Sequence, residues 1–161
     1  DLQFAQHHLR ILSGLYGILR PLDLIQPYRL MMGVKVSPAR GRKDLYAWWK
    51  DRITVELKKV LKKSGSKVII NLASDEYFKA VDTEALGAEV ITPIFKDKHA
   101  GTYKLLSVFF KHQRGAMTRH IIQNRILEPE KLKRYTGDEY YFSAEDSTAN
   151  EWIFLRDKRP G

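Results

Sequence analysis

The segment Leu12–Gly33 limits the choice of fold more than any other part of the chain, because it is both apolar and interrupted by glycine and proline. Gly14 and Gly17 end or turn the helical pattern that precedes them, and each proline biases the residue before it toward extended backbone. One regular element cannot run through such a segment. The sequence predicts a helix over Gln3–Leu12, a tight glycine hairpin, and then an extended, half-buried arm.

This glycine hairpin allows two interpretations. Its backbone N–H groups can turn outward and, with Arg20 and Arg29 nearby, hold a phosphate or another anion. Alternatively, Gly14 and Gly17 only let two apolar segments pack closely, which is the commoner role of a Gly-x-x-Gly pair. The sequence alone leaves both interpretations open.

The charge balance points to a polyanionic partner. The chain has 28 Lys and Arg against 19 Asp and Glu, a formal net charge of +9, and phosphate contacts release counterions without any readout of bases. The alternative is that these charges only solvate the surface. Basic residues gather near the hairpin, in a loop after Gly33, and around a helix expected to start near Gln113. The candidate DNA-binding or phosphate-binding residues are Gly14, Gly17, Arg20, Arg29, Arg40, Arg42, Lys111, Arg114 and Arg119.

A second polar cluster follows the predicted buried strand Lys67–Ala73. Open sheets place ligand sites at the carboxyl ends of their strands, so this cluster is the best candidate for a ligand pocket. Helix capping by Ser74 and acidic residues in a first turn explain most of it without catalysis. No histidine and no Gly-x-Ser-x-Gly motif accompany Ser74. The pocket residues are Asn71, Ser74, Asp75, Glu76, Tyr77 and Lys79.

The remaining pattern predicts an α+β fold, with a mixed sheet flanked by three or four helices. Asp44 and Gly65 are expected to begin and end one long helix. Pro93 argues that its strand lies at an edge or ends there. The predicted strands are Lys67–Ala73, Ala88–Phe95, Thr102–Phe110, Tyr140–Phe142 and Trp152–Arg156.

Length and composition set outer limits. A chain of 161 residues suits a single domain, residues 1–161. No apolar run approaches the roughly 18 residues that a membrane span needs. The absence of cysteine excludes disulfides and thiolate metal sites and fits a reducing, cytoplasmic location.

Three separated stretches, in this order along the chain, resemble the YaaA family of bacterial peroxide-stress proteins, long described as being of unknown function. They are Leu12–Gly33 (LSGLYGILRPLDLIQPYRLMMG), Asn71–Ala80 (NLASDEYFKA) and Lys111–Ile122 (KHQRGAMTRHII). The resemblance implies a cytoplasmic protein of the oxidative stress response that limits unincorporated iron and DNA damage. It also implies an α+β fold with a basic cleft, and DNA binding through a helix–hairpin–helix-like element that Gly14–Gly17 would match.

Two differences from the family pattern stand out. Family members carry an additional N-terminal portion, so the resemblance implies that this chain corresponds to about the C-terminal two-thirds of one. Met31 stands where the family's run YRLEMG has an acidic residue.

The function predicted on these grounds is non-catalytic DNA binding that recognises backbone or shape rather than sequence, because no base-reading motif is visible. No cofactor, metal, membrane or protein partner is predicted. Two alternatives stay open. One is an enzyme or anion-binding protein that acts on a phosphorylated small molecule through Asn71–Lys79. The other is an iron-handling protein, although no ligand spacing resembles a metal motif.

Overall fold

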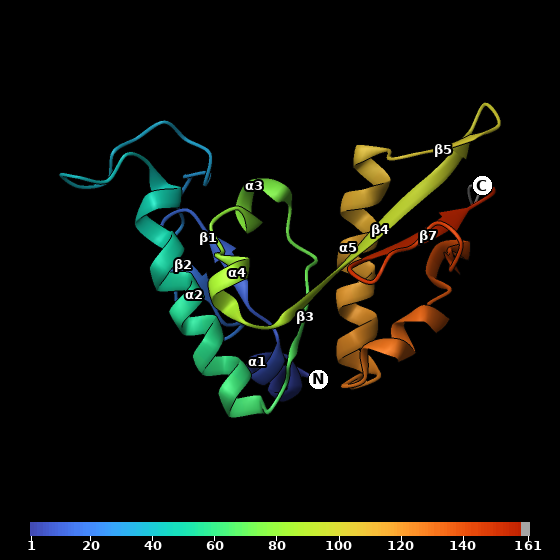
Figure 1. Cartoon of the computed structure of the whole chain (residues 1–161), viewed down its shortest axis with the longest axis horizontal. Helices are drawn as coiled ribbons and strands as arrows, with labels where there is room; N and C mark the ends of the chain where they lie inside the picture. The colour runs from blue at the N-terminus through green and yellow to red at the C-terminus, as the bar shows by residue number, and fades with distance from the viewer. Residues whose placement is uncertain (159–161) are drawn as a thin grey trace. The chain divides into compact units, whose positions relative to one another are not determined.

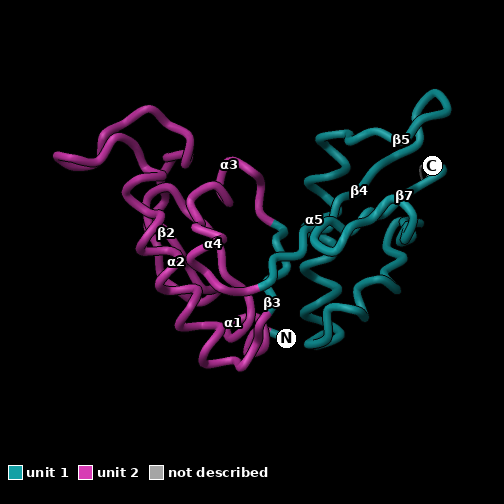
Figure 2. The backbone as a smooth tube through the Cα atoms, viewed as in Figure 1, with its two compact units in different colours: residues 1, 68–72, 89–161 teal, residues 2–67, 73–88 magenta. Residues whose placement is uncertain are grey.

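The computed structural model describes residues 1–158, which cluster into two compact units (Figure 2). Unit 1 holds Val68–Leu72 and the chain from Glu89 onward, together with Asp1, and unit 2 holds Leu2–Lys67 and Ala73–Ala88. Residues 159–161 lie outside the described residues, and the single domain predicted over residues 1–161 stays a prediction.

Unit 1 is built on a mixed five-stranded sheet, which confirms the predicted α+β class. Its strand order is β3-β4-β7-β6, with β5 also paired to β4. The pairs β3–β4 and β4–β7 are parallel, whereas β4–β5 and β6–β7 are antiparallel. The strands are β3 (Val68–Ile70), β4 (Glu89–His99), β5 (Thr102–Lys104), β6 (Tyr141–Ser143) and β7 (Glu151–Arg156).

The core of unit 1 lies between this sheet and the helix α5 (Ser107–Gln123), which runs alongside β4 in Figure 1. Buried and less buried residues alternate along β4, as expected of a strand with one face on a core. The Phe95 ring stacks on Phe154 with centroids 5.2 Å apart and meets Tyr140 edge-on at 5.3 Å. Two short 3₁₀ helices, η1 (Pro129–Arg134) and η2 (Gly137–Glu139), complete the unit.

The prediction of a strand through Phe110 was wrong at its end. The strand β5 stops at Lys104, and α5 begins at Ser107 rather than near Gln113. Short apolar runs are ambiguous between strand and helix when only the sequence is known. Here helix wins because Phe110, Gln113 and Met117, spaced three and four residues apart, share one helix face; Gln113 and Met117 are buried, and Phe110 packs against the core.

Of the two alternatives predicted for Pro93, a strand end is wrong, since β4 continues for six residues beyond it. An edge agrees with the pairing at Pro93 itself, where β7 alone pairs with β4 among residues 1–158. Proline is tolerated because β4 changes partners around it. β3 pairs with β4 only as far as Ile91, and β5 begins to pair only at Asp97. The Thr92 N–H donates to Asn150 on the β7 side at 2.7 Å. Alternation along the strand therefore directs the missing Pro93 donor toward the side where, among residues 1–158, no strand pairs with it.

Unit 2 combines a two-stranded antiparallel hairpin with helices. Asp44 caps α2, because its Oδ1 accepts from the Ala47 N–H at 2.8 Å, and Gly65 ends that helix with φ 70°. Both predictions are confirmed. No helix within residues 1–158 is long and apolar enough to cross a membrane. The elements are α1 (Leu2–His8), β1 (Ile11–Ser13), β2 (Gly17–Leu19), α2 (Leu45–Ser64), α3 (Asp75–Phe78) and α4 (Thr83–Leu86).

The glycine turn joins two strands rather than two helices. The helix predicted over Gln3–Leu12 ends at His8, and Ile11–Ser13 pairs with Gly17–Leu19. After β2 the chain continues without a regular element before Leu45, as the prediction of an extended arm requires. The predicted half-burial was wrong, because most of the arm is exposed and Met32 alone among residues 20–36 is buried.

Candidate nucleic-acid interface

The two hairpin glycines are packed against other parts of unit 2. A side chain at Gly14 would collide with the backbone carbonyl of Leu30, and a Cβ at Gly17, whose φ is +75°, would lie 2.5 Å from the indole of Trp49. The Trp49 Nε1–H also donates to the Gly14 carbonyl at 2.9 Å. Close packing therefore accounts for both glycines, and donation of their N–H groups to a phosphate stays a prediction.

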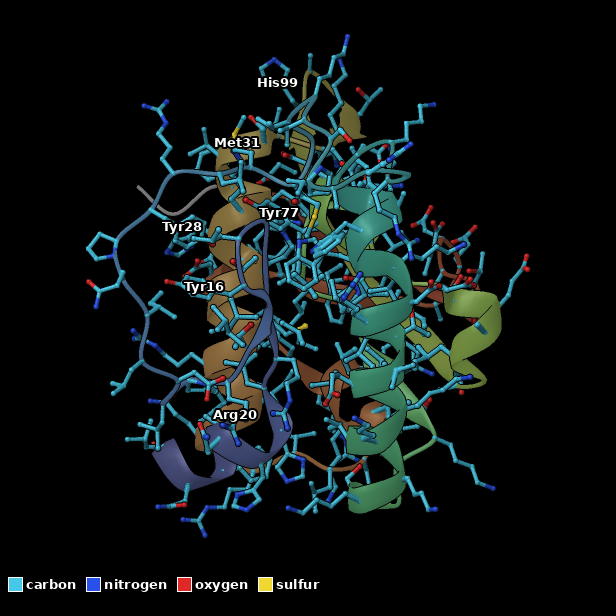
Figure 3. The ribbon with its side chains drawn as sticks, turned by 90° about the vertical axis from the view of Figure 1, so that its left-hand side faces the viewer. Tyr16, Arg20, Tyr28, Met31, Tyr77 and His99 are labelled. Atoms are coloured by element: carbon cyan, nitrogen blue, oxygen red, sulfur yellow. The ribbon has the colours of Figure 1, made fainter. Side chains whose placement is uncertain are left out.

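Two tyrosines attach the arm to the hairpin, as Figure 3 shows. The Tyr28 hydroxyl lies 2.5 Å from the buried Ser13 Oγ, which also accepts from the Tyr16 N–H at 3.0 Å. The Tyr16 hydroxyl in turn accepts from the Gln26 N–H at 3.0 Å. The two rings meet edge-on, with centroids 5.4 Å apart. The arm thus has a defined conformation although it has no regular secondary structure.

Arg20, the first predicted phosphate ligand, is already paired. Its Nε and Nη2 donate to Asp23 Oδ1 at 2.9 and 2.7 Å, and its backbone N–H donates to Oδ2 at 2.8 Å. This hydrogen bonding raises the pKa of Arg20 and lowers the pKa of Asp23. The pair carries no net charge, so a phosphate would have to compete with Asp23 for this guanidinium.

The other predicted cations of unit 2 lie between residues 24 and 43, a stretch with five Lys and Arg and no Asp or Glu. Arg29 and Arg40 are exposed. Arg42 is half-buried and donates from Nη1 to the Ala47 carbonyl at 3.0 Å, which ties the basic loop to the first turn of α2. This hydrogen bond therefore fixes the end of the basic loop that adjoins α2.

Helix α5 of unit 1 carries the remaining predicted cations. Its 17 residues include Lys111, Arg114 and Arg119 and no acidic residue. Lys111 and Arg119 are exposed, and the Arg114 guanidinium lies 4.2 Å from the centroid of the Phe110 ring. His120 on the same helix is partly buried, and burial lowers its pKa. His120 therefore contributes less positive charge to α5 at neutral pH than an unburied histidine would.

A network at the start of α5 was missed by sequence reasoning. Asp138, at φ 50°, accepts from Gln113 Nε2, and its carboxylate also lies 3.4 Å from His112 Nδ1. The buried Arg156 extends this network, because it donates to the Asp138 carbonyl at 3.4 Å and forms an ion pair with Asp97 at 2.6 Å. These partners are 18 to 59 residues apart in sequence, and no local pattern signals them.

The predicted ligand pocket divides between the two units. Asn71 belongs to unit 1, where its N–H donates to the Ile91 carbonyl at 2.8 Å and its Nδ2 to Thr92 Oγ1 at 3.3 Å. The other five predicted pocket residues belong to unit 2. Asn71 thus has a structural role at the end of β3, whereas a ligand for the cluster stays a prediction.

Within unit 2, Ser74 stands at the N-cap of α3 without a side-chain capping bond. Glu76 Oε1 instead accepts from the Gly33 N–H at 3.0 Å, and burial raises the pKa of Tyr77. The acidic first turn of α3 therefore holds the end of the arm. Within the described part of the chain, no group of three or more His, Asp or Glu is placed to hold a metal ion.

Comparison with known proteins gives the family. The family described as "Peroxide stress protein YaaA" matches residues 1–146. The chain belongs to the YaaA family. Two relatives, each named "UPF0246 protein", come from Teredinibacter turnerae and Ralstonia pickettii. They are 53% and 52% identical to this chain over 156 residues, which is 97% of the chain. The resemblance predicted from the three motifs is confirmed, and the chain spans 60% of the length of these YaaA-family relatives.

Proposed function

We propose that this chain binds DNA through the phosphate backbone, as part of the peroxide response that gives its family its name. The observation that carries the proposal is the segregation of charge. The stretch 24–43 and the helix α5 together hold eight Lys and Arg and none of the 19 acidic residues. Neither segment contributes a carboxylate of its own; among residues 1–158, the carboxylates that contact them are Glu76, at Gly33, and Asp138, at His112 and Gln113.

The Arg20–Asp23 pair illustrates why segregation matters. A carboxylate 2.7 Å from a guanidinium neutralises it and competes with any phosphate for its donors. Exposed cations without such partners gain more from a polyanion, because each phosphate contact releases condensed counterions. In this proposal Arg29, Arg40 and Arg119 make the phosphate contacts, while the Gly14–Gly17 turn between the strands β1 and β2 adds backbone N–H donors.

Backbone binding also links the proposal to iron-dependent DNA damage. The same counterion release that drives binding displaces other condensed cations, ferrous iron among them, from the covered phosphates. No base-reading motif accompanies the cations, so recognition rests on backbone and shape. Protection would then follow occupancy of the DNA rather than catalysis.

The test is fluorescence anisotropy of a labelled duplex, and of the same duplex carrying a bulge, titrated with the chain at about 50 and about 200 mM salt. Arg119→Ala should weaken binding about equally on all sequences and lower the salt slope by about one unit. Arg114→Ala should act in the same direction. Lys62→Ala is the matched control, because it removes an equal charge from the exposed last turn of α2.

Two results would contradict the proposal. One is affinity that does not change with salt, since phosphate contacts require such a dependence. The other is equal affinity for the Arg119→Ala and Lys62→Ala variants, which would mean that only net charge matters and that α5 is not the interface.

A further inference from the structure

The segment Leu22–Val36, here named the apolar arm, exposes an unusual share of large apolar side chains. Leu24 is fully exposed, at 100% of its accessible surface. Exposed apolar residues scattered singly are normal, whereas a contiguous group marks a binding surface. The group consists of Leu22, Leu24, Ile25, Tyr28, Met31, Val34 and Val36.

Hydrogen bonds to other residues of unit 2 hold the apolar arm in place. Three side chains of unit 2 accept hydrogen bonds of 3.0 Å from arm N–H groups: Gln6 from Leu22, Tyr16 from Gln26, and Glu76 from Gly33. Met32 is completely buried and anchors the arm in unit 2. The backbone is therefore fixed, and the apolar side chains other than those of Met32 and the hairpin-bound Tyr28 stay in solvent. A surface ordered in advance loses less entropy when it is covered.

The apolar side chains of the arm favour a protein over DNA as their cover, while Arg29 keeps the phosphate contact proposed above. Phosphates need cations, but Arg29 and Lys35 are the only charged residues of the arm after Asp23. Apolar side chains gain from contact with other apolar side chains. The matched 156 residues are 60% of each relative, so roughly 100 further residues lie outside the match, enough to contribute a substantial apolar face.

We propose that the apolar arm is the docking surface for this further region in full-length members of the family. The inference does not depend on DNA binding, since it uses the apolar side chains and not the basic ones. It assigns the arm a structural partner within the same polypeptide.

The absence of cysteine from the chain allows a direct test. Leu24→Cys places one thiol on the arm, and Leu127→Cys places one on another exposed leucine, at 69% exposure, outside it. Each variant is prepared as this chain alone and joined, in the natural order, to the unmatched region of the Teredinibacter turnerae relative, with any cysteines of that region changed to serine. The measurement is the rate of labelling by a thiol-reactive dye.

The expected result is labelling of Leu24→Cys that is about tenfold or more slower in the joined protein than in the chain alone, because the docked region must first detach from the arm before the thiol can react. Labelling of Leu127→Cys should stay within about twofold. Equal rates for Leu24→Cys in both forms would overturn the proposal. Slow labelling of Leu24→Cys in the chain alone would overturn the proposal as well. If labelling becomes slower as the protein concentration rises, a second copy of the chain covers the arm. If the labelling rate does not depend on protein concentration, another part of the same chain covers it.

Hydrogen exchange on the natural relative covers the case in which the joined protein does not fold. In the intact Teredinibacter turnerae protein, peptides matching the apolar arm should exchange about tenfold or more slowly than in a form cut back to the matched region. The same exchange rate in both forms would refute docking.

Discussion

Replacing Gly17 by alanine should destabilise the protein through two separable effects. The backbone at Gly17 has φ +75°, and a left-handed conformation costs a non-glycine residue about 1–2 kcal/mol. The new Cβ would also lie 2.5 Å from the Trp49 indole, which must shift, and such overpacking costs about 1–3 kcal/mol. The expected loss is therefore about 2–5 kcal/mol in the free energy of unfolding.

Gly65→Ala is the matched control. Gly65 has nearly the same φ, +70°, but beyond its chain neighbours no atom of the described residues lies within 4 Å of the position that its Cβ would take. It should cost only the conformational part, about 1–2 kcal/mol. The assay is urea unfolding at 25 °C followed by circular dichroism, with the slope of unfolding free energy on urea compared among variants.

A double variant isolates the Trp49 contact. In a Trp49→Ala background the collision no longer exists, so Gly17→Ala should cost about as much as Gly65→Ala does in the unaltered chain. Equal losses for Gly17→Ala and Gly65→Ala in the unaltered chain would refute the packing argument. The glycine at position 17 would then be explained by its turn conformation alone.

Two further changes test polar contacts. Asp97→Asn should lower the free energy of unfolding by about 3–5 kcal/mol in urea unfolding, because the charge of Arg156, only 2% exposed, loses its carboxylate partner. The double variant Asp97→Leu with Arg156→Met should cost less than Asp97→Leu alone or Arg156→Met alone, because it leaves no buried charge unpaired. A larger cost for the double variant would contradict this account. For Asp82, a side-chain hydrogen bond from Lys50 is the main cause of its lowered pKa. Asp82→Asn should therefore lower the free energy of unfolding at neutral pH. The difference in this free energy between the variant and the unaltered chain should shrink as the pH falls below 3.8, the ordinary pKa of an aspartate, and through the lowered pKa of Asp82. A difference that stays constant down to about pH 2 would exclude the ion pair as its cause.

Local signals made part of the fold predictable. Asp44 and Gly65 mark the ends of α2 through contacts within four residues, so capping chemistry alone locates them. The alternation along Glu89–His99 likewise indicates a strand. The end of Thr102–Phe110 could not be assigned this way, because its helical state depends on Phe110 meeting Phe95, a contact across the fold.

The candidate interface was predictable in composition but not in detail. The exposed state of Arg29, Arg40 and Arg119 agrees with their polarity and needs no tertiary contact. The Asp23 partner of Arg20 lies only three residues away and could have been anticipated. The bond from Gly33 to Glu76 spans 43 residues and that from Trp49 to Gly14 spans 35, so the anchoring of the arm and of the hairpin glycines became visible only in the folded chain.

The position of Pro93 has a consequence for solubility. Between Thr92 and Lys96, one side of β4 has no paired strand among residues 1–158. An unpaired strand edge, where another chain can reach it, recruits strands from other molecules and starts aggregation. Pro93 offers no N–H inside that gap and is itself buried, so an incoming strand would find neither a donor nor open space at this residue. The residue that looks out of place in a central strand thus protects the sheet from its neighbours in a crowded cell.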